Sequence, residues 1–132
     1  MGAHPYHYLV DYDENVRAAL ERLRREVFER GAYHGAQKRP RTPEQALELA
    51  WETGTRSILD ITRISDRPDY CCAAPLTAAE VQRHFGTATP TAGMVEACDE
   101  LWESLERGKA RYTVAYEGGV PRHIVFVGYS FD

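Results

Sequence analysis

The sequence predicts an α+β fold: a small, mostly antiparallel sheet, amphipathic helices packed on one face of it, and a C-terminal β-hairpin. Two observations support this prediction. Tyrosines recur at every-second-residue spacing near both ends of the chain, which is the period of a strand. Between the two ends, apolar residues recur at helical spacing. The expected order along the chain is strand, helix, helix, strand, helix, helix, strand, strand, within a single domain spanning residues 1–132.

The first strand and the first helix are the clearest elements. Tyr6 to Tyr12 alternates aromatic or apolar residues with His7, Leu9 and Asp11, as a half-buried strand does. A helix is then expected to begin at Asp13 and to end at Gly31. Its apolar residues form one stripe at helical spacing: Val16, Ala19, Leu20, Leu23, Val27 and Phe28.

The middle of the chain alternates loops with shorter elements. The segment Ala32 to Arg41 has loop composition, and Thr42-Pro43 begins a helix that is expected to reach Thr53. Residues 55–64 fit a strand or a short helix, and their β-branched content favours the strand. A long loop, Ser65 to Pro75, is expected to follow.

The second half contains two further helices and a hairpin. Thr77 and Glu80 form a capping box that begins a helix ending at Phe85. Another helix is expected between Pro90 and Gly108. The glycine pair 118–119 separates two alternating runs, residues 111–117 and 122–131, which predicts a hairpin.

Composition and charge exclude several classes of protein. A net charge of −4 argues against nucleic-acid binding, because neutralising phosphates requires a clustered positive face. No apolar run is long enough for a membrane helix, so we expect no membrane partner. The N-terminus lacks the features of a signal peptide, and three cysteines fit a reducing compartment, so a cytoplasmic location is expected. The excess of arginine over lysine is typical of high-GC bacterial genomes.

The two faces of the sheet suggest different roles. The face of the sheet that carries the alternating tyrosines is the more apolar one and is expected to lie beneath the helices. An exposed tyrosine platform for bases is disfavoured by the acidic charge. The opposite face is expected to combine an apolar centre with a polar border, which is typical of a protein interface or a homodimer. The residues assigned to this partner surface are His7, Leu9, Arg111, Ile124 and Phe126. The alternatives are that helices cover both faces or that these apolar residues have no binding role.

Candidate catalytic residues are few. Asp60 lies between apolar neighbours, where a carboxylate needs an ion pair, a backbone donor or a catalytic role. Cys71 or Cys72 in the long loop could act as a nucleophile if His34 or His84 came within hydrogen-bond distance. The spacing of histidines and cysteines matches no zinc motif, and the sequence predicts no metal site and no cofactor.

These observations favour a small cytoplasmic protein that acts through contact with another protein or with itself, such as an accessory, antitoxin-like or immunity-like protein. Its acidity would suit a basic partner. Two alternatives remain open. One is a small enzyme with a cysteine, histidine and aspartate site at the 65–75 loop, and the other is a small-ligand sensor with a pocket between sheet and helices.

Overall fold

Five strands form one mixed sheet in the order β1-β5-β4-β3-β2 in the computed structural model, which describes residues 3–132. The strands are β1 (Pro5–Asp11), β2 (Arg63–Ile64), β3 (Cys72–Pro75), β4 (Ala110–Glu117) and β5 (Val120–Tyr129). β5 pairs antiparallel with both β1 and β4, whereas β3 pairs parallel with both β2 and β4. The α+β class is confirmed, but the expectation of a mostly antiparallel sheet is wrong for the half containing β2 and β3.

The two ends of the chain pair with each other through β1 and β5. Tyr6 lies opposite Gly128, Tyr8 opposite Phe126 and Val10 opposite Ile124. Gly128 is required at its position because a Cβ atom there would lie 2.5 Å from the Tyr6 hydroxyl. This register puts Tyr6, Tyr8, Ile124 and Phe126 on one face of the sheet, which we call the tyrosine face.

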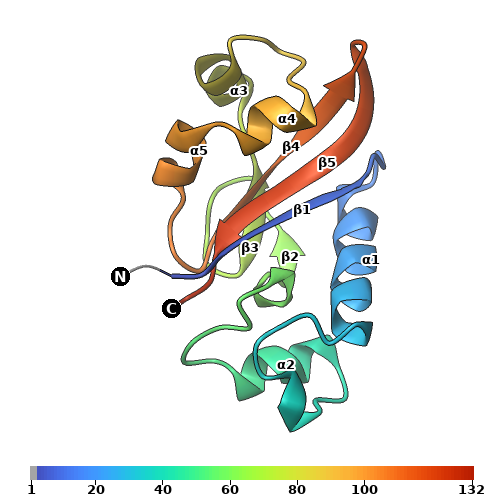
Figure 1. Cartoon of the computed structure of the whole chain (residues 1–132), viewed down its shortest axis with the longest axis vertical. Helices are drawn as coiled ribbons and strands as arrows, with labels where there is room; N and C mark the ends of the chain where they lie inside the picture. The colour runs from blue at the N-terminus through green and yellow to red at the C-terminus, as the bar shows by residue number, and fades with distance from the viewer. Residues whose placement is uncertain (1–2) are drawn as a thin grey trace.

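Helices cover both faces of the sheet, so the expectation that they pack on one face is wrong (Figure 1). On the tyrosine face, α1 (Val16–Glu29) and the 3-10 turn η2 (Ile58–Asp60) pack over a core that includes Ile124 and Phe126. On the opposite face, α3 (Ala78–Phe85), α4 (Ala92–Glu96) and α5 (Asp99–Ser104) cover Val125 and Val127. The 3-10 turn η1 (Ala36–Lys38) and α2 (Pro43–Leu49) lie at the end of the molecule beyond β2.

Local signals explain most of the helix boundaries. The side chain of Asn15 accepts a hydrogen bond from the backbone N–H of Ala18, so α1 begins after Asn15 rather than at Asp13. The capping box predicted at Thr77 and Glu80 is present at the start of α3. α2 ends at Leu49, earlier than the predicted Thr53.

Two buried segments differ from the prediction. Residues 58–61 are fully buried, and Ile58–Asp60 form the η2 turn instead of a strand, with Ser57 as its N-cap; only Arg63–Ile64 pair as a strand. Within the predicted 65–75 loop, Cys72–Pro75 forms β3, whose first three residues are fully buried. A short strand covered on both faces shows no alternation of polar and apolar residues, so its sequence resembles neither a strand nor a helix.

The helix predicted between Pro90 and Gly108 is broken into α4 and α5. Cys98 adopts an extended backbone and separates the two. Val95 and Leu101 are both fully buried. In one straight helix, residues six apart point about 120° away from each other. The break therefore allows both side chains to reach the same core.

The C-terminal hairpin is confirmed. Gly118 and Gly119 both have positive φ, 60° and 80°, as the two central residues of a type I′ turn require. β4 and β5 extend from this turn with a register shift between Ala115 and Tyr116.

Removing the hydroxyl group should affect stability differently at two tyrosines of the tyrosine face. The Tyr6 hydroxyl is buried without a hydrogen-bond partner in the described chain, whereas the Tyr8 hydroxyl accepts a bond from the backbone N–H of Ile58 at 3.3 Å. Tyr6→Phe removes an unsatisfied polar group, so the free energy of unfolding should stay unchanged or rise. Tyr8→Phe should lower it by about 1 kcal/mol, because a buried donor loses its acceptor. Urea denaturation of the two matched variants measures the difference, and a larger loss for Tyr6→Phe would contradict the predicted order.

Candidate functional site

The residues predicted for a partner surface do not lie together. The register places Ile124 and Phe126 on the tyrosine face, where both are fully buried beneath α1. His7 and Leu9 lie on the opposite face of β1, at the edge of the sheet, and both are exposed. The predicted apolar centre is therefore part of the core, while the two β1 residues remain available to a partner.

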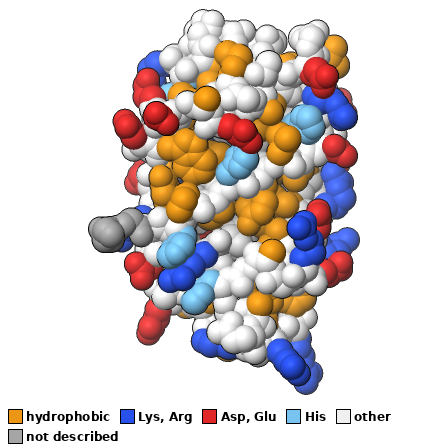
Figure 2. All heavy atoms as spheres, in the orientation of Figure 1, with side chains coloured by type: hydrophobic (Ala, Val, Ile, Leu, Met, Phe, Trp, Pro, Cys, Tyr) orange, Lys and Arg blue, Asp and Glu red, His pale blue; other side chains and the backbone are white. Residues whose placement is uncertain are grey.

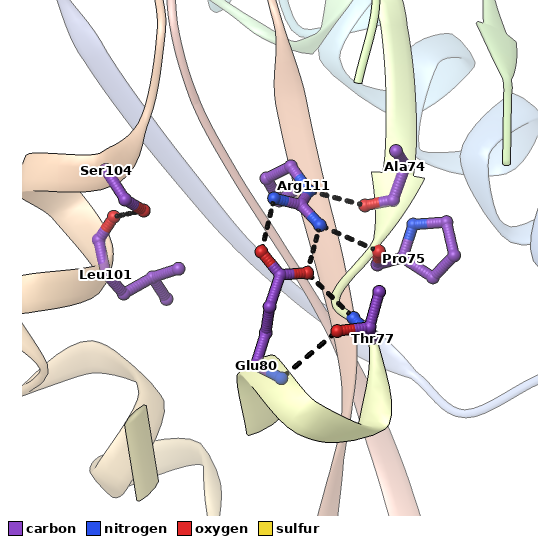
Figure 3. Close-up of polar contacts among 7 residues, drawn as sticks. All are labelled: Ala74, Pro75, Thr77, Glu80, Leu101, Ser104 and Arg111. Atoms are coloured by element: carbon purple, nitrogen blue, oxygen red, sulfur yellow. Dashed lines mark hydrogen bonds and ion pairs between the residues drawn. The ribbon is translucent and has the colours of Figure 1, made fainter. Parts of the chain in front are cut away.

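Arg111, the fifth predicted partner residue, is held within the protein. Its guanidinium donates to both carboxylate oxygens of Glu80, at 2.6 and 3.1 Å, and to the backbone carbonyls of Ala74 and Pro75 (Figure 3). The bidentate pair joins α3 to β4 and to the end of β3. Its hydrogen bonds lower the pKa of Glu80 to about 2. Arg111 is therefore a structural residue that fixes α3 on the sheet.

Asp60 is the candidate carboxylate, and it is fully buried. Its Oδ1 accepts from the backbone N–H of Thr55 at 2.6 Å and from the Thr55 hydroxyl at 2.7 Å, and its Oδ2 accepts from the Ser130 hydroxyl at 2.6 Å. Burial raises the pKa of Asp60 despite these bonds. The bond to Ser130 links η2 to the C-terminal segment. Because Asp60 is fully buried, it has no access to a substrate.

The structure does not assemble the candidate catalytic group. The Cys71 thiol lies close enough to Asp60 for that carboxylate to affect it, but burial first, and then Asp60, raise the pKa of Cys71. A nucleophilic cysteine needs the opposite shift. The neighbouring Cys72 is fully buried, and its Sγ contacts the Tyr70 carbonyl.

Neither candidate histidine is placed to activate these thiols. The backbone N–H of His34 donates to Thr55, and its side chain lines a hollow beside α2. His84 is on α3, on the far face of the sheet; its ring is buried and both ring nitrogens lack a hydrogen-bond partner within residues 3–132. No hydrogen bond in the described chain joins a histidine ring to Cys71 or Cys72.

The hollow beside α2 is the place where a small ligand could bind. It has a volume of about 450 Å³ and is lined by residues that include His34, Lys38 and Trp51. The Lys38 ammonium donates to the Leu49 carbonyl, and the Trp51 ring packs against Phe131. Lys38 and Trp51 are therefore engaged within the protein, and the lining also includes the polar side chains of Gln37, Glu48 and Glu52.

The edge of the sheet formed by β1 is open. Two backbone hydrogen bonds, from Tyr12 to Arg122 and from Ser130 to His4, lie at the two ends of β1. They show that the N–H and C=O groups of the even-numbered residues are the ones that bond to β5. Because bonding alternates along an antiparallel strand, the N–H and C=O groups of His7, Leu9 and Asp11 point away from the sheet. No hydrogen bond from residues 3–132 reaches these groups.

Hollows flank this edge on both sides. One, of about 330 Å³, lies between β1 and α1 and is lined by Leu9, Asp11, Arg22 and Glu26 among others. The other, of about 300 Å³, is lined by Pro5, Tyr6, His7, Trp102 and Tyr129. Hydrophobic and histidine side chains gather on this side of the molecule, over β1 (Figure 2). Leu9 and Tyr12 are both more than a third exposed.

The strand at the opposite edge of the sheet, β2, is much shorter than β1. β2 has only two residues, and an adjoining bond from Ser65 to Ala73 continues its pairing with β3. Short edge strands are a common device against unwanted strand pairing. β1, with seven residues, lacks that protection. The contrast makes the β1 edge the strongest candidate for a functional site in the described part of the chain.

Comparison with known proteins supplies no relative: no family model, curated protein or solved structure matches this chain. Within residues 3–132, no helix is long and apolar enough to cross a membrane, and no three histidine, cysteine or acidic side chains are grouped so that they could bind a metal ion. The candidate site therefore depends on geometry alone.

The Glu80–Arg111 pair predicts a sensitivity to acid. Because the folded pKa of Glu80 is about 2, its carboxylate stabilises the fold above the unfolded pKa of about 4.3, and this contribution is lost as the pH falls through the folded value. Glu80→Gln should lower the free energy of unfolding at pH 7 by about 1–2 kcal/mol. The difference from the wild-type chain should shrink between pH 5 and pH 2. Urea titrations across this range test both points, and a constant difference would contradict the assignment.

Asp60 predicts the opposite trend with pH. Its raised pKa means that the folded chain holds a proton that the unfolded chain releases near pH 4, so this group reduces stability as the pH rises through that window. Asn at position 60 retains an oxygen for Thr55, and its amide can donate to Ser130, whose hydroxyl can bond to the Thr53 carbonyl. The stability of the wild-type chain relative to Asp60→Asn should therefore fall as the pH rises above 4. Asp60→Ala, which leaves the Thr55 N–H unpaired, should cost about 3 kcal/mol at neutral pH.

Proposed function

We propose that this protein works by protein–protein contact through the open edge of β1, which pairs with an extended segment of a partner polypeptide. The observation that carries this proposal is the row of outward backbone groups on His7, Leu9 and Asp11, which have no partner in the described chain. An added strand would satisfy these groups and extend the sheet beyond β1.

Side chains around the edge support strand addition. Leu9 is 44% exposed and lies at the centre of the row. An added strand would remove the apolar surface of its side chain from water. The hollow beside α1 gives side chains of the partner on the tyrosine face somewhere to lie, and the hollow beside Trp102 does so on the other face. Backbone bonds would then supply affinity, and the two hollows would supply specificity.

Strand addition also fits the rigidity of the site. β1 is paired along its whole length with β5, which lies between β1 and β4. The edge is therefore already in the conformation that an incoming strand needs, and little ordering cost remains on this side of the contact. An accessory, antitoxin-like or immunity-like role in the cytoplasm would use such a contact.

A photo-reactive amino acid at position 9, introduced into the full chain in its own host cells, tests the proposal. Val120 is the matched control, because it is an exposed apolar strand residue at 62% exposure and belongs to the hairpin rather than to the β1 edge. We expect a cross-linked polypeptide, identified by mass spectrometry, to form several-fold more at position 9 than at position 120. Equal or weaker cross-linking at position 9 would overturn the proposal.

A further inference from the structure

We infer that the strand that completes the edge is β1 of a second copy of this chain, paired antiparallel about a two-fold axis at Leu9. This inference rests on the proposed function, since it names the partner of the same edge. It comes from the register that the outward residues of β1 allow.

Proline restricts the possible registers. A two-fold axis pairs residues of β1 with residues of its copy so that only outward-facing residues bond to each other. The outward row is Pro5, His7, Leu9 and Asp11, and Pro5 has no N–H to donate. With the axis at Leu9, the N–H and C=O groups of His7, Leu9 and Asp11 all find partners, and Pro5 lies outside the paired segment. With the axis at Tyr8, Asp11 would face Pro5 and its carbonyl would receive no donor.

The side chains that this register brings together are complementary. Leu9 meets Leu9 of the second copy at the axis, where two exposed apolar side chains cover each other. On either side, His7 lies opposite Asp11 of the second copy. Nε2 of His7 contacts Glu96 at 2.9 Å, so Nδ1 is the ring nitrogen left for Asp11. The shifted register would instead place His7 opposite Leu9.

The tyrosine face is equally compatible with the register. Tyr8 would lie opposite Val10 of the second copy, and Tyr6 opposite Tyr12, so that each cross-strand contact includes at least one aromatic side chain. Tyr12 is 39% exposed in the single chain and would be covered. The groove beside each β1 carries both Arg22 and Glu26 from α1, so two copies of this surface do not bring only like charges together.

The overall charge does not prevent the association. Each copy carries a net charge of −4, which opposes the approach of two copies at low ionic strength. At physiological ionic strength, charges more than about 8 Å apart are largely screened, so the contacts at the axis decide the outcome.

Cysteine cross-linking of the full chain tests the register. Leu9→Cys should form a disulfide-linked dimer with oxidised glutathione, because paired residues at the axis have a Cα separation of about 5.5 Å. His7→Cys is the matched control on the same face of the same strand, and it should not link to itself, since the register offsets the two copies of residue 7. A mixture of His7→Cys and Asp11→Cys chains should link, although neither chain alone does so. The wild-type chain gives the background from its own three cysteines.

Sedimentation velocity of the wild-type chain provides the second readout. The mass should rise with concentration from 15.0 kDa to twice that value, and Leu9→Pro, which removes the N–H at the axis, should weaken the association at least tenfold. A mass that stays at one chain, or a dimer in which Leu9→Cys links no better than His7→Cys, would overturn the inference. Cross-linking of position 9 in cells to a different polypeptide would overturn the second copy as partner and leave the proposed edge contact standing. The absence of any preferred cross-link at position 9 would overturn both.

Discussion

The antiparallel pairing of β1 with β5 is the constraint on which the rest of this structure depends. It joins the first strand of the chain to the last, and it places β5 between β1 and β4. The register determines which side chains enter the core, because Tyr6 and Tyr8 must share a face with Ile124 and Phe126. The same register leaves the backbone groups of the odd-numbered β1 residues without a partner in the sheet. Core composition and the open edge are thus two consequences of one alignment.

Buried hydrogen bonds hold the chain just after β5 in place. Ser130, just beyond β5, donates to Asp60 and accepts from the backbone N–H of Arg56, so the C-terminal segment is tied to the turn that supports α1. Gly54 is required beside this network, because a Cβ atom there would overlap the Ser130 hydroxyl. A buried carboxylate with three neutral donors is costly to ionise, but the loss of any member would leave another group unsatisfied. Asp60 is therefore better explained by architecture than by catalysis.

Local chemistry in the sequence predicts a large part of the fold. The capping box at Thr77 and the glycine pair at Gly118 and Gly119 act within a few residues, and the structure contains both. β3 could not be predicted, because its residues are buried on both faces and carry no alternation. The sequence predicts the wrong face for Ile124 and Phe126 for a related reason: both sides of β5 are apolar, since helices cover both faces. Only the long-range register with β1 decides which side joins the tyrosines.

The candidate site illustrates the same division. Alternation alone identifies His7 and Leu9 as residues on the side of β1 away from the tyrosines, but edge position is a property of strand order and does not appear in local sequence. The length of β1 limits the strength of the proposed edge contact. In the proposed contact, a strand of about seven residues would bury less surface than the roughly 1,000 Å² of a stable interface, so its affinity would come from backbone bonds and a few side chains such as Leu9. A contact of that size would respond to protein concentration, and a single substitution at its centre would weaken it strongly.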